Sequence, residues 1–90
     1  MSVAAASTWQ VYILKCADGS LYTGITTNIE QRLTVHNAGT GAKYTRGRLP
    51  VTLVYAEPAE GRATASQREA AIKKLGRAAK LCLIDNYAAH

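Results

Sequence analysis

Residues 9–26 read WQVYILKCADGSLYTGIT, and this stretch decides the fold. Its two ends are rich in β-branched and aromatic residues, which is typical of strands. Residues 17–20 between them read ADGS, which is typical of a tight turn because Asp can bond its own backbone and Gly accepts a positive φ. The stretch therefore predicts a β-hairpin.

The length of the hairpin loop decides where its two tyrosines, Tyr12 and Tyr22, point. Side chains alternate along a strand, so a two-residue Asp-Gly turn would place the two rings on opposite faces. A three-residue loop over residues 17–19 would pair Cys16 with Ser20 and place both rings on one face. Glycine at the third loop position favours this longer loop. We therefore expect both tyrosines on one face of the sheet.

A helix follows the hairpin. Residues 27–30 read TNIE, which predicts a helix start with Thr27 as the cap and Glu30 completing a capping box. The helix should run to about Ala38 and end before Gly39, since glycine commonly follows the last helical residue.

The second half of the chain predicts a loop, a strand and two more helices. We expect a loop over residues 40–50, a third strand over 51–57, and helices over 64–75 and 77–87. Thr64 would start the first of these helices, with Gln67 as a candidate capping partner. The predicted order of elements is β-β-α-β-α-α.

Length and charge limit the class of protein. Ninety residues leave no room for a second core, so we expect one domain over residues 9–87. Eleven Lys and Arg outweigh six Asp and Glu, a balance that suits a polyanionic partner such as nucleic acid. Residues 1–8 resemble a flexible arm rather than a signal peptide, and no segment is apolar enough to span a membrane. We expect a cytoplasmic protein.

Two polar side chains of the first helix, Arg32 and His36, fall four residues apart. At 100° per residue His36 falls on the apolar stripe that Ile29 and Leu33 mark, and Arg32 lies at its edge. One reading is a solvated Arg and a satisfied core His. The other is an anion site, because a guanidinium turned inward needs an anionic partner and matches a phosphate bidentately.

Glu69 is the only acidic residue of the predicted helix over 64–75. It could form an ordinary ion pair with Lys73, four residues later. It could also be an oxygen ligand for Mg²⁺, which takes few protein carboxylates and keeps several waters. The tyrosines have two readings as well: core packing, or orientation and deprotonation of a water with help from a metal or a cation.

A basic segment interrupted by glycines follows the first helix. It carries Lys43, Tyr44, Arg46 and Arg48, and Lys73 extends the positive charge in the later helix. Such a segment can be a plain exposed loop. It can also follow a phosphate backbone and stack on a base, which makes these five residues candidates for binding nucleic acid.

Taken together, these residues resemble the GIY-YIG nuclease superfamily from Trp9 to about Ile84, and most of all its small stand-alone bacterial members. The first family motif falls on Gln10-Val11-Tyr12, with Gln10 in place of Gly. The second falls on Tyr22-Thr23-Gly24, with Thr23 in place of Ile. Both tyrosines and the second motif's glycine are retained.

The resemblance implies a fold and a set of site residues. The fold is α+β, a three-stranded antiparallel sheet flanked by helices, in agreement with the predicted order of elements. The family's helical arginine falls on Arg32, a His or Tyr found four residues later falls on His36, and the metal-binding glutamate falls on Glu69. Tyr22 is the first choice for the base that activates water, supported by Tyr12, with His36 as a further candidate.

The implied activity is hydrolysis of DNA phosphodiester bonds with a single divalent ion, Mg²⁺ or Mn²⁺. Branched or nicked duplexes linked to repair or recombination are plausible targets, and RNA stays open as a partner. The alternatives are a weakly active or inactive nucleic-acid-binding module of the same fold, and a protein-interaction domain. The sequence indicates neither the preferred target nor the oligomeric state.

Overall fold

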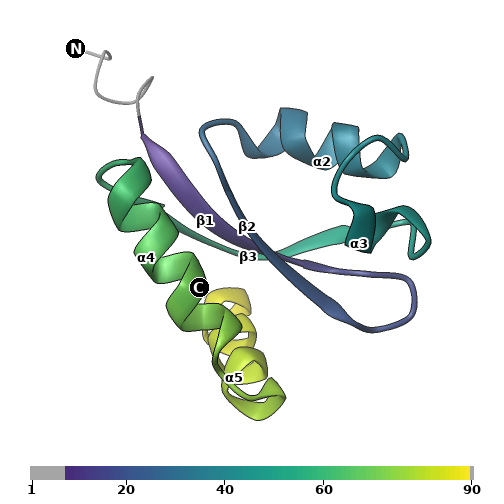
Figure 1. The fold of residues 1–90 in the computed structure, drawn as a ribbon. Coiled ribbons are helices and arrows are strands. Elements are labelled where there is room, and N and C mark those ends of the chain that lie inside the picture. Colours follow the sequence, from purple (N-terminus) through teal and green to yellow (C-terminus); the bar gives the residue numbers. More distant parts are fainter. Residues whose placement is uncertain (1–7, 90) are drawn as a thin grey trace.

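Three antiparallel strands form one sheet in the computed structural model, which describes residues 8–89 (Figure 1). Strand β1 (Trp9–Lys15) lies in the middle, between β2 (Leu21–Thr26) and β3 (Thr52–Ala59). The predicted α+β class and the β-β-α-β-α-α order are confirmed, with one added helical turn between the first long helix and β3.

Helices cover both faces of this sheet. Helix α2 (Ile29–Asn37) and the single turn α3 (Lys43–Arg46) follow β2. Helices α4 (Arg62–Lys73) and α5 (Arg77–Ala88) follow β3, and α4 also contacts the edge strand β2. No helix among residues 8–89 is long and apolar enough to cross a membrane.

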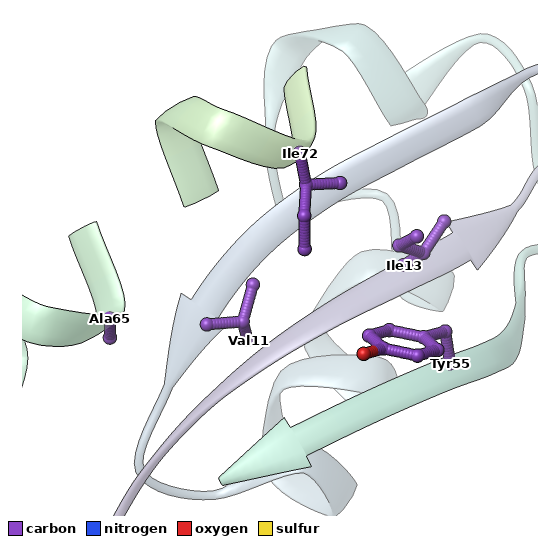
Figure 2. Packing of buried hydrophobic residues seen from close by; sticks show 5 residues of the cluster. All are labelled: Val11, Ile13, Tyr55, Ala65 and Ile72. Carbon is purple, nitrogen blue, oxygen red and sulfur yellow. The ribbon is translucent and has the colours of Figure 1, made fainter. Parts of the chain in front are cut away.

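The central strand β1 is buried on both of its faces. Val11 and Ile13 are fully buried against α4, where they meet Ala65 and Ile72, and Tyr55 of β3 completes this cluster (Figure 2). Full burial of one such aliphatic side chain contributes about 1.5–3 kcal/mol. This cluster therefore fixes α4 on one face of the sheet.

The alternate residues of β1 form a second cluster on the opposite face. Tyr12 and Leu14 are buried there with Val51, and Ile29 and Leu33 of α2 pack against them. The apolar stripe predicted for the first helix is thus the surface that holds α2 to the sheet. It also fixes the direction in which the polar residues of α2 project.

The hairpin has the predicted three-residue loop. The amide of Cys16 donates to the carbonyl of Ser20 at 2.9 Å, and Gly19 has a φ of 86°. In the resulting register Tyr12 pairs with Gly24 and Leu14 pairs with Tyr22. The predicted placement of both tyrosines on one face is therefore confirmed.

The predicted cap of the first helix is wrong by one residue. Asn28, not Thr27, caps α2, and its side chain accepts a hydrogen bond from the amide of Gln31 at 3.0 Å. The hydroxyl of Thr26 in turn accepts from the amide of Asn28 at 3.1 Å. Asn and Thr are both favoured N-cap residues. Here the hydrogen bond from the Asn28 amide to the Thr26 hydroxyl holds Asn28 at the cap position.

Other predicted boundaries also shift. Helix α4 begins at Arg62 after Gly61 with no side-chain cap, so Thr64 and Gln67 lie inside the helix and form no capping box. Strand β3 continues through Pro58, which an edge strand tolerates because one side of its backbone needs no partner. The predicted N-terminal arm, Thr8 excepted, lies outside the described residues.

Candidate active site

The tyrosine rings of the hairpin lie side by side, and a glycine makes room for them. The ring centroids of Tyr12 and Tyr22 are 6.4 Å apart. A Cβ atom at Gly24, the strand partner of Tyr12, would lie 2.6 Å from the Tyr12 hydroxyl oxygen. Glycine at this motif position is thus explained by the close approach of a ring.

A chain of hydrogen bonds fixes His36 beneath these rings. His36 is buried, its Nε2 lies 3.2 Å from the Tyr12 hydroxyl, and its Nδ1 lies 2.9 Å from Oγ1 of Thr45. The Thr45 hydroxyl donates to the carbonyl of Ala42 at 2.9 Å. Because that hydroxyl has one proton, all three bonds are satisfied when Nδ1–H donates to Thr45 and Nε2 accepts from Tyr12.

The backbone closes tightly around His36. A Cβ atom at Gly41 would lie 2.4 Å from Nδ1 of His36 and 2.9 Å from its Cα. The segment between α2 and α3 can therefore pass over the imidazole only as glycine.

Burial favours the neutral form of both partners in this hydrogen bond. Burial, with Tyr22 as the next contributor, raises the pKa of the Tyr12 hydroxyl well above its usual range. Burial, and then the charge of Arg32, lowers the pKa of His36. At neutral pH Tyr12 is therefore protonated and His36 is neutral, which fits the direction of the hydrogen bond between them.

Arg32 and Glu69 supply the charges of the site. Arg32 is exposed, which matches its reading as a solvated Arg, and it is not turned into the core. Arg32 borders a cavity, and its guanidinium keeps its contact with water. Glu69 forms the ion pair predicted as its ordinary role, 3.3 Å from Lys73, yet its side chain is only 24% exposed and borders the same cavity. Glu69 reaches this cavity from α4, which contacts β2 at the edge of the sheet.

All five predicted catalytic residues therefore meet around one cavity of about 360 Å³. They come from four elements, β1, β2, α2 and α4. The cavity is bordered by Tyr12, Tyr22, Arg32, His36 and Glu69, with Gly24, Ile25 and residues 40–42.

The carboxylate of Glu69 is the one acidic group of this cavity, and it fits a magnesium ion better than a closed metal cage. Among residues 8–89 no group of three or more His, Cys, Asp or Glu side chains could hold a metal. Mg²⁺ is commonly held by one or two carboxylates, with waters and substrate phosphates completing its shell. Glu69 could hold such an ion, whereas a zinc site would need three or four protein ligands.

The predicted nucleic-acid residues have different surroundings. Tyr44 is 41% exposed and stacks near Tyr22, with ring centroids 6.0 Å apart. Arg48 is held by two contacts. It lies 4.2 Å from the centroid of the Tyr44 ring and forms an ion pair with Asp18 at 3.0 Å. Arg46 is exposed and bonds the carbonyl of Gly41.

Lys43 and Lys73 complete that predicted set. Lys43 is exposed at the start of α3, and Lys73 borders a second cavity beside the first. Three of the five predicted nucleic-acid residues thus lie on α3, a turn of helix where the sequence predicts a loop, and Arg48 follows two residues after it.

Sequence reasoning missed Thr45 and Gly41. Thr45 is fully buried and orients His36, yet in the sequence it is one threonine inside a basic segment. Gly41 stands among other glycines, and nothing local distinguishes it. Only the contact with His36 from another element shows what these residues do.

Comparison with known sequences defines the class of protein. Residues 8–81 match the family described as the GIY-YIG catalytic domain, and the chain belongs to this nuclease family. Within it, the similar proteins are small chains named UPF0213. The chain is 60% identical to a UPF0213 protein of Clostridium perfringens over 76 residues, 84% of this chain and 82% of the relative. It is 57% identical to one of Natronomonas pharaonis over 74 residues, 82% of this chain and 87% of the relative.

Two solved structures share the fold. A UPF0213 protein from Bacillus halodurans, solved by NMR, is 44% identical with a TM-score of 0.56, covering 87% of this chain and 83% of that one. A protein from E. faecalis, also solved by NMR, is 45% identical with a TM-score of 0.61, covering 92% of this chain and 88% of that one.

Proposed function

We propose that this protein is a metal-dependent DNA endonuclease that hydrolyses phosphodiester bonds. The observation that carries the proposal is the meeting of two tyrosines, a histidine, an arginine and a glutamate around one cavity. Branched or nicked duplexes, of the kind that arise in repair and recombination, are the proposed targets.

Arg32 and Glu69 have different electrostatic roles in this proposal: Arg32 contacts the phosphate, and Glu69 holds the metal ion. Because Arg32 is exposed at the cavity, its guanidinium is free to meet a phosphate and to stabilise the charge that builds on the phosphoryl oxygens. Glu69 would hold the divalent ion, which when bound neutralises charge on the scissile phosphate and the leaving oxygen.

The hydrogen-bond direction supports Tyr22 rather than Tyr12 as the group that activates water. The Tyr12 proton is engaged by Nε2 of His36, and the raised pKa of Tyr12 opposes its deprotonation. Tyr22 borders the cavity in contact with the His36 ring, at a centroid distance of 5.3 Å. Tyr12 and His36 would then act together, holding Tyr22 and the water in place.

The ion pair between Glu69 and Lys73 favours the alternative, a binding module of the same fold with little or no turnover. In that case Glu69 would serve to anchor Lys73, and the lysine would contact phosphate. Binding would then need no metal, whereas the nuclease requires one.

A plasmid assay separates the two proposals. Supercoiled and branched DNA are incubated with the protein and Mg²⁺ or Mn²⁺, with EDTA as the blank. The nuclease predicts nicking that EDTA stops and that Glu69→Gln abolishes. Glu60→Gln, a change at an exposed acidic residue in the loop before α4, should leave nicking intact. Metal-independent binding without nicking would support the module, and nicking that survives EDTA would exclude the single-metal site.

A further inference from the structure

A second cavity of about 330 Å³ adjoins the candidate active site. Tyr22 borders both cavities, so they share one wall. The second cavity is bordered by Leu21, Tyr22, Thr23, Tyr44, Lys73 and Lys80. Its residues come from β2, α3, α4 and α5.

We propose that this cavity is a subsite for one unpaired nucleotide next to the cleaved phosphate. The proposal rests on the proposed nuclease function, which supplies the phosphate in the neighbouring cavity. The volume lies at the lower end of the range for small-molecule pockets, as expected for a single nucleotide.

The aromatic wall of the subsite suits a nucleobase. The rings of Tyr22 and Tyr44 are inclined by only 26°, with centroids 6.0 Å apart, and Tyr44 remains 41% exposed. Arg48 keeps Tyr44 in place, since it lies over the ring and its Nη1 donates to the Tyr44 carbonyl at 2.7 Å. Every base has a π-face, so contact with the exposed part of this aromatic pair would tolerate any sequence.

Two lysines place positive charge at the edge of the same cavity. Lys73 and Lys80 both border it, from α4 and α5. The Lys73 ammonium lies 3.3 Å from Glu69, which borders the active-site cavity, so this charge stands between the two cavities. A phosphate that links a base in the subsite to the cleaved position would meet Lys73 there.

An apolar and aromatic cavity with cations at its rim takes a base only when that base has left its stack. A paired base in an intact duplex is stacked between its neighbours and must be unpaired first. A flap, a bulge, a frayed end or a single strand presents an unpaired base at little cost in free energy. The substrate class is therefore DNA with at least one unpaired nucleotide beside the cleaved bond.

Binding to two single strands of equal charge tests this. We compare the affinity of the wild-type chain for a fluorescent dT 8-mer and for a fully abasic 8-mer in EDTA, so that nothing is cleaved. The subsite predicts about tenfold tighter binding of the dT strand, since stacking one base on an aromatic ring has an effect of this order. Equal binding of the two strands by the wild type would overturn the proposal without any variant.

Matched variants assign the base preference to this cavity. Tyr44→Leu should reduce the preference for the dT strand to within about twofold, and Tyr44→Trp should keep it. Tyr87→Leu is the control, because Tyr87 on α5 is 42% exposed, like Tyr44, and lies outside the cavity. Lys80→Gln should weaken both strands equally and lower the log–log salt slope by about 0.7, the value for one phosphate contact on a single strand.

The outcomes separate the subsite from the nuclease. A base preference that depends on Tyr44 in a protein that never nicks plasmid would overturn the nuclease and keep the subsite. Metal-dependent nicking with equal binding of both strands, or a preference that Tyr44→Leu leaves unchanged, would overturn the subsite alone.

Discussion

The Tyr12 hydroxyl lies 3.2 Å from Nε2 of His36, and the His36 tautomer that satisfies Thr45 makes this hydroxyl the donor. This contact joins the first motif of the hairpin to helix α2, 24 residues later in the chain. The two tyrosines of the site therefore differ in their hydrogen bonding, because the hydroxyl of Tyr12, and not that of Tyr22, bonds the imidazole.

Thr45→Val should lower both stability and activity. The substitution keeps the shape of the side chain but removes the oxygen that accepts from Nδ1 of His36 at 2.9 Å. A buried polar group left without its partner costs about 1–3 kcal/mol in the free energy of unfolding. The imidazole also loses the bond that fixes its tautomer, so nicking should fall about tenfold or more.

Urea unfolding and plasmid nicking check this prediction, with Thr34→Val as the control. Thr34 is exposed, and its hydroxyl bonds a carbonyl of its own helix at 3.0 Å. That control should change the free energy of unfolding by less than about 0.5 kcal/mol. Equal effects of the two substitutions would show that Thr45 does not position His36.

Gly41→Ala should destabilise the protein and inactivate it, while Gly47→Ala should not. The new Cβ at residue 41 would lie 2.4 Å from Nδ1 of His36 and 2.9 Å from its Cα, so the backbone as well as the ring would have to shift. Forcing extra volume into a packed site costs about 1–3 kcal/mol. At residue 47 a Cβ meets nothing within 4 Å and φ is −94°, so alanine fits there. Thermal melts of both variants check the contrast, and equal melting temperatures would contradict the close approach.

The hairpin half of this site could be predicted from the sequence because its causes are local. Gly19 sets the loop, the loop sets the register, and the register puts Tyr12 and Tyr22 on one face. The phase of α2 likewise turns His36 toward the sheet. These steps need only the alternation of side chains along a strand and 100° per residue along a helix.

The rest of the site depends on contacts between distant elements. Residues 43–46 form a helical turn whose Thr45 supports His36, but glycines and polar residues around them predict a loop. Arg32 is exposed at the cavity, and the other walls of that cavity come from elements that the phase of α2 does not place. Glu69 forms the ion pair with Lys73 and also borders the cavity, and its role as a metal ligand stays a prediction.

Arg32→Ala should slow cleavage far more than it weakens DNA binding. The guanidinium acts on charge that develops during the reaction, and loss of one such donor typically costs about 10²–10³ in rate. Stability should change by less than about 0.5 kcal/mol, since Arg32 is exposed. Single-turnover rates at saturating protein and affinities measured in EDTA separate the two effects.

Arg46→Ala is the contrasting variant for this measurement. Arg46 is exposed on α3 and lies outside the candidate active-site cavity, so its loss should weaken binding and leave the saturated rate nearly unchanged. If Arg32→Ala lost affinity and rate in equal measure, Arg32 would be a phosphate-binding residue without a special role in the transition state.

Acid should destabilise the protein through His36 as the pH falls below about 6.5, the usual pKa of histidine in an unfolded chain. Burial, and then Arg32, lowers the pKa of His36 in the folded state. Between the lowered pKa and the ordinary one the unfolded chain binds more protons than the folded one, so stability rises with pH in this window. The contribution is fully present above about pH 6.5 and is lost as the pH falls toward the folded pKa.

Free energies of unfolding at pH 7.5, 6.5 and 5.5 check the sign of this effect. His36→Asn should be less stable than the wild type at pH 7.5 but should lose less stability on acidification, and His90 is present in both chains and cancels from the comparison. Nicking should fall over the same range, since a protonated Nε2 can no longer accept from Tyr12. A wild-type stability that stays flat or rises on acidification would show that His36 is not held neutral by its surroundings.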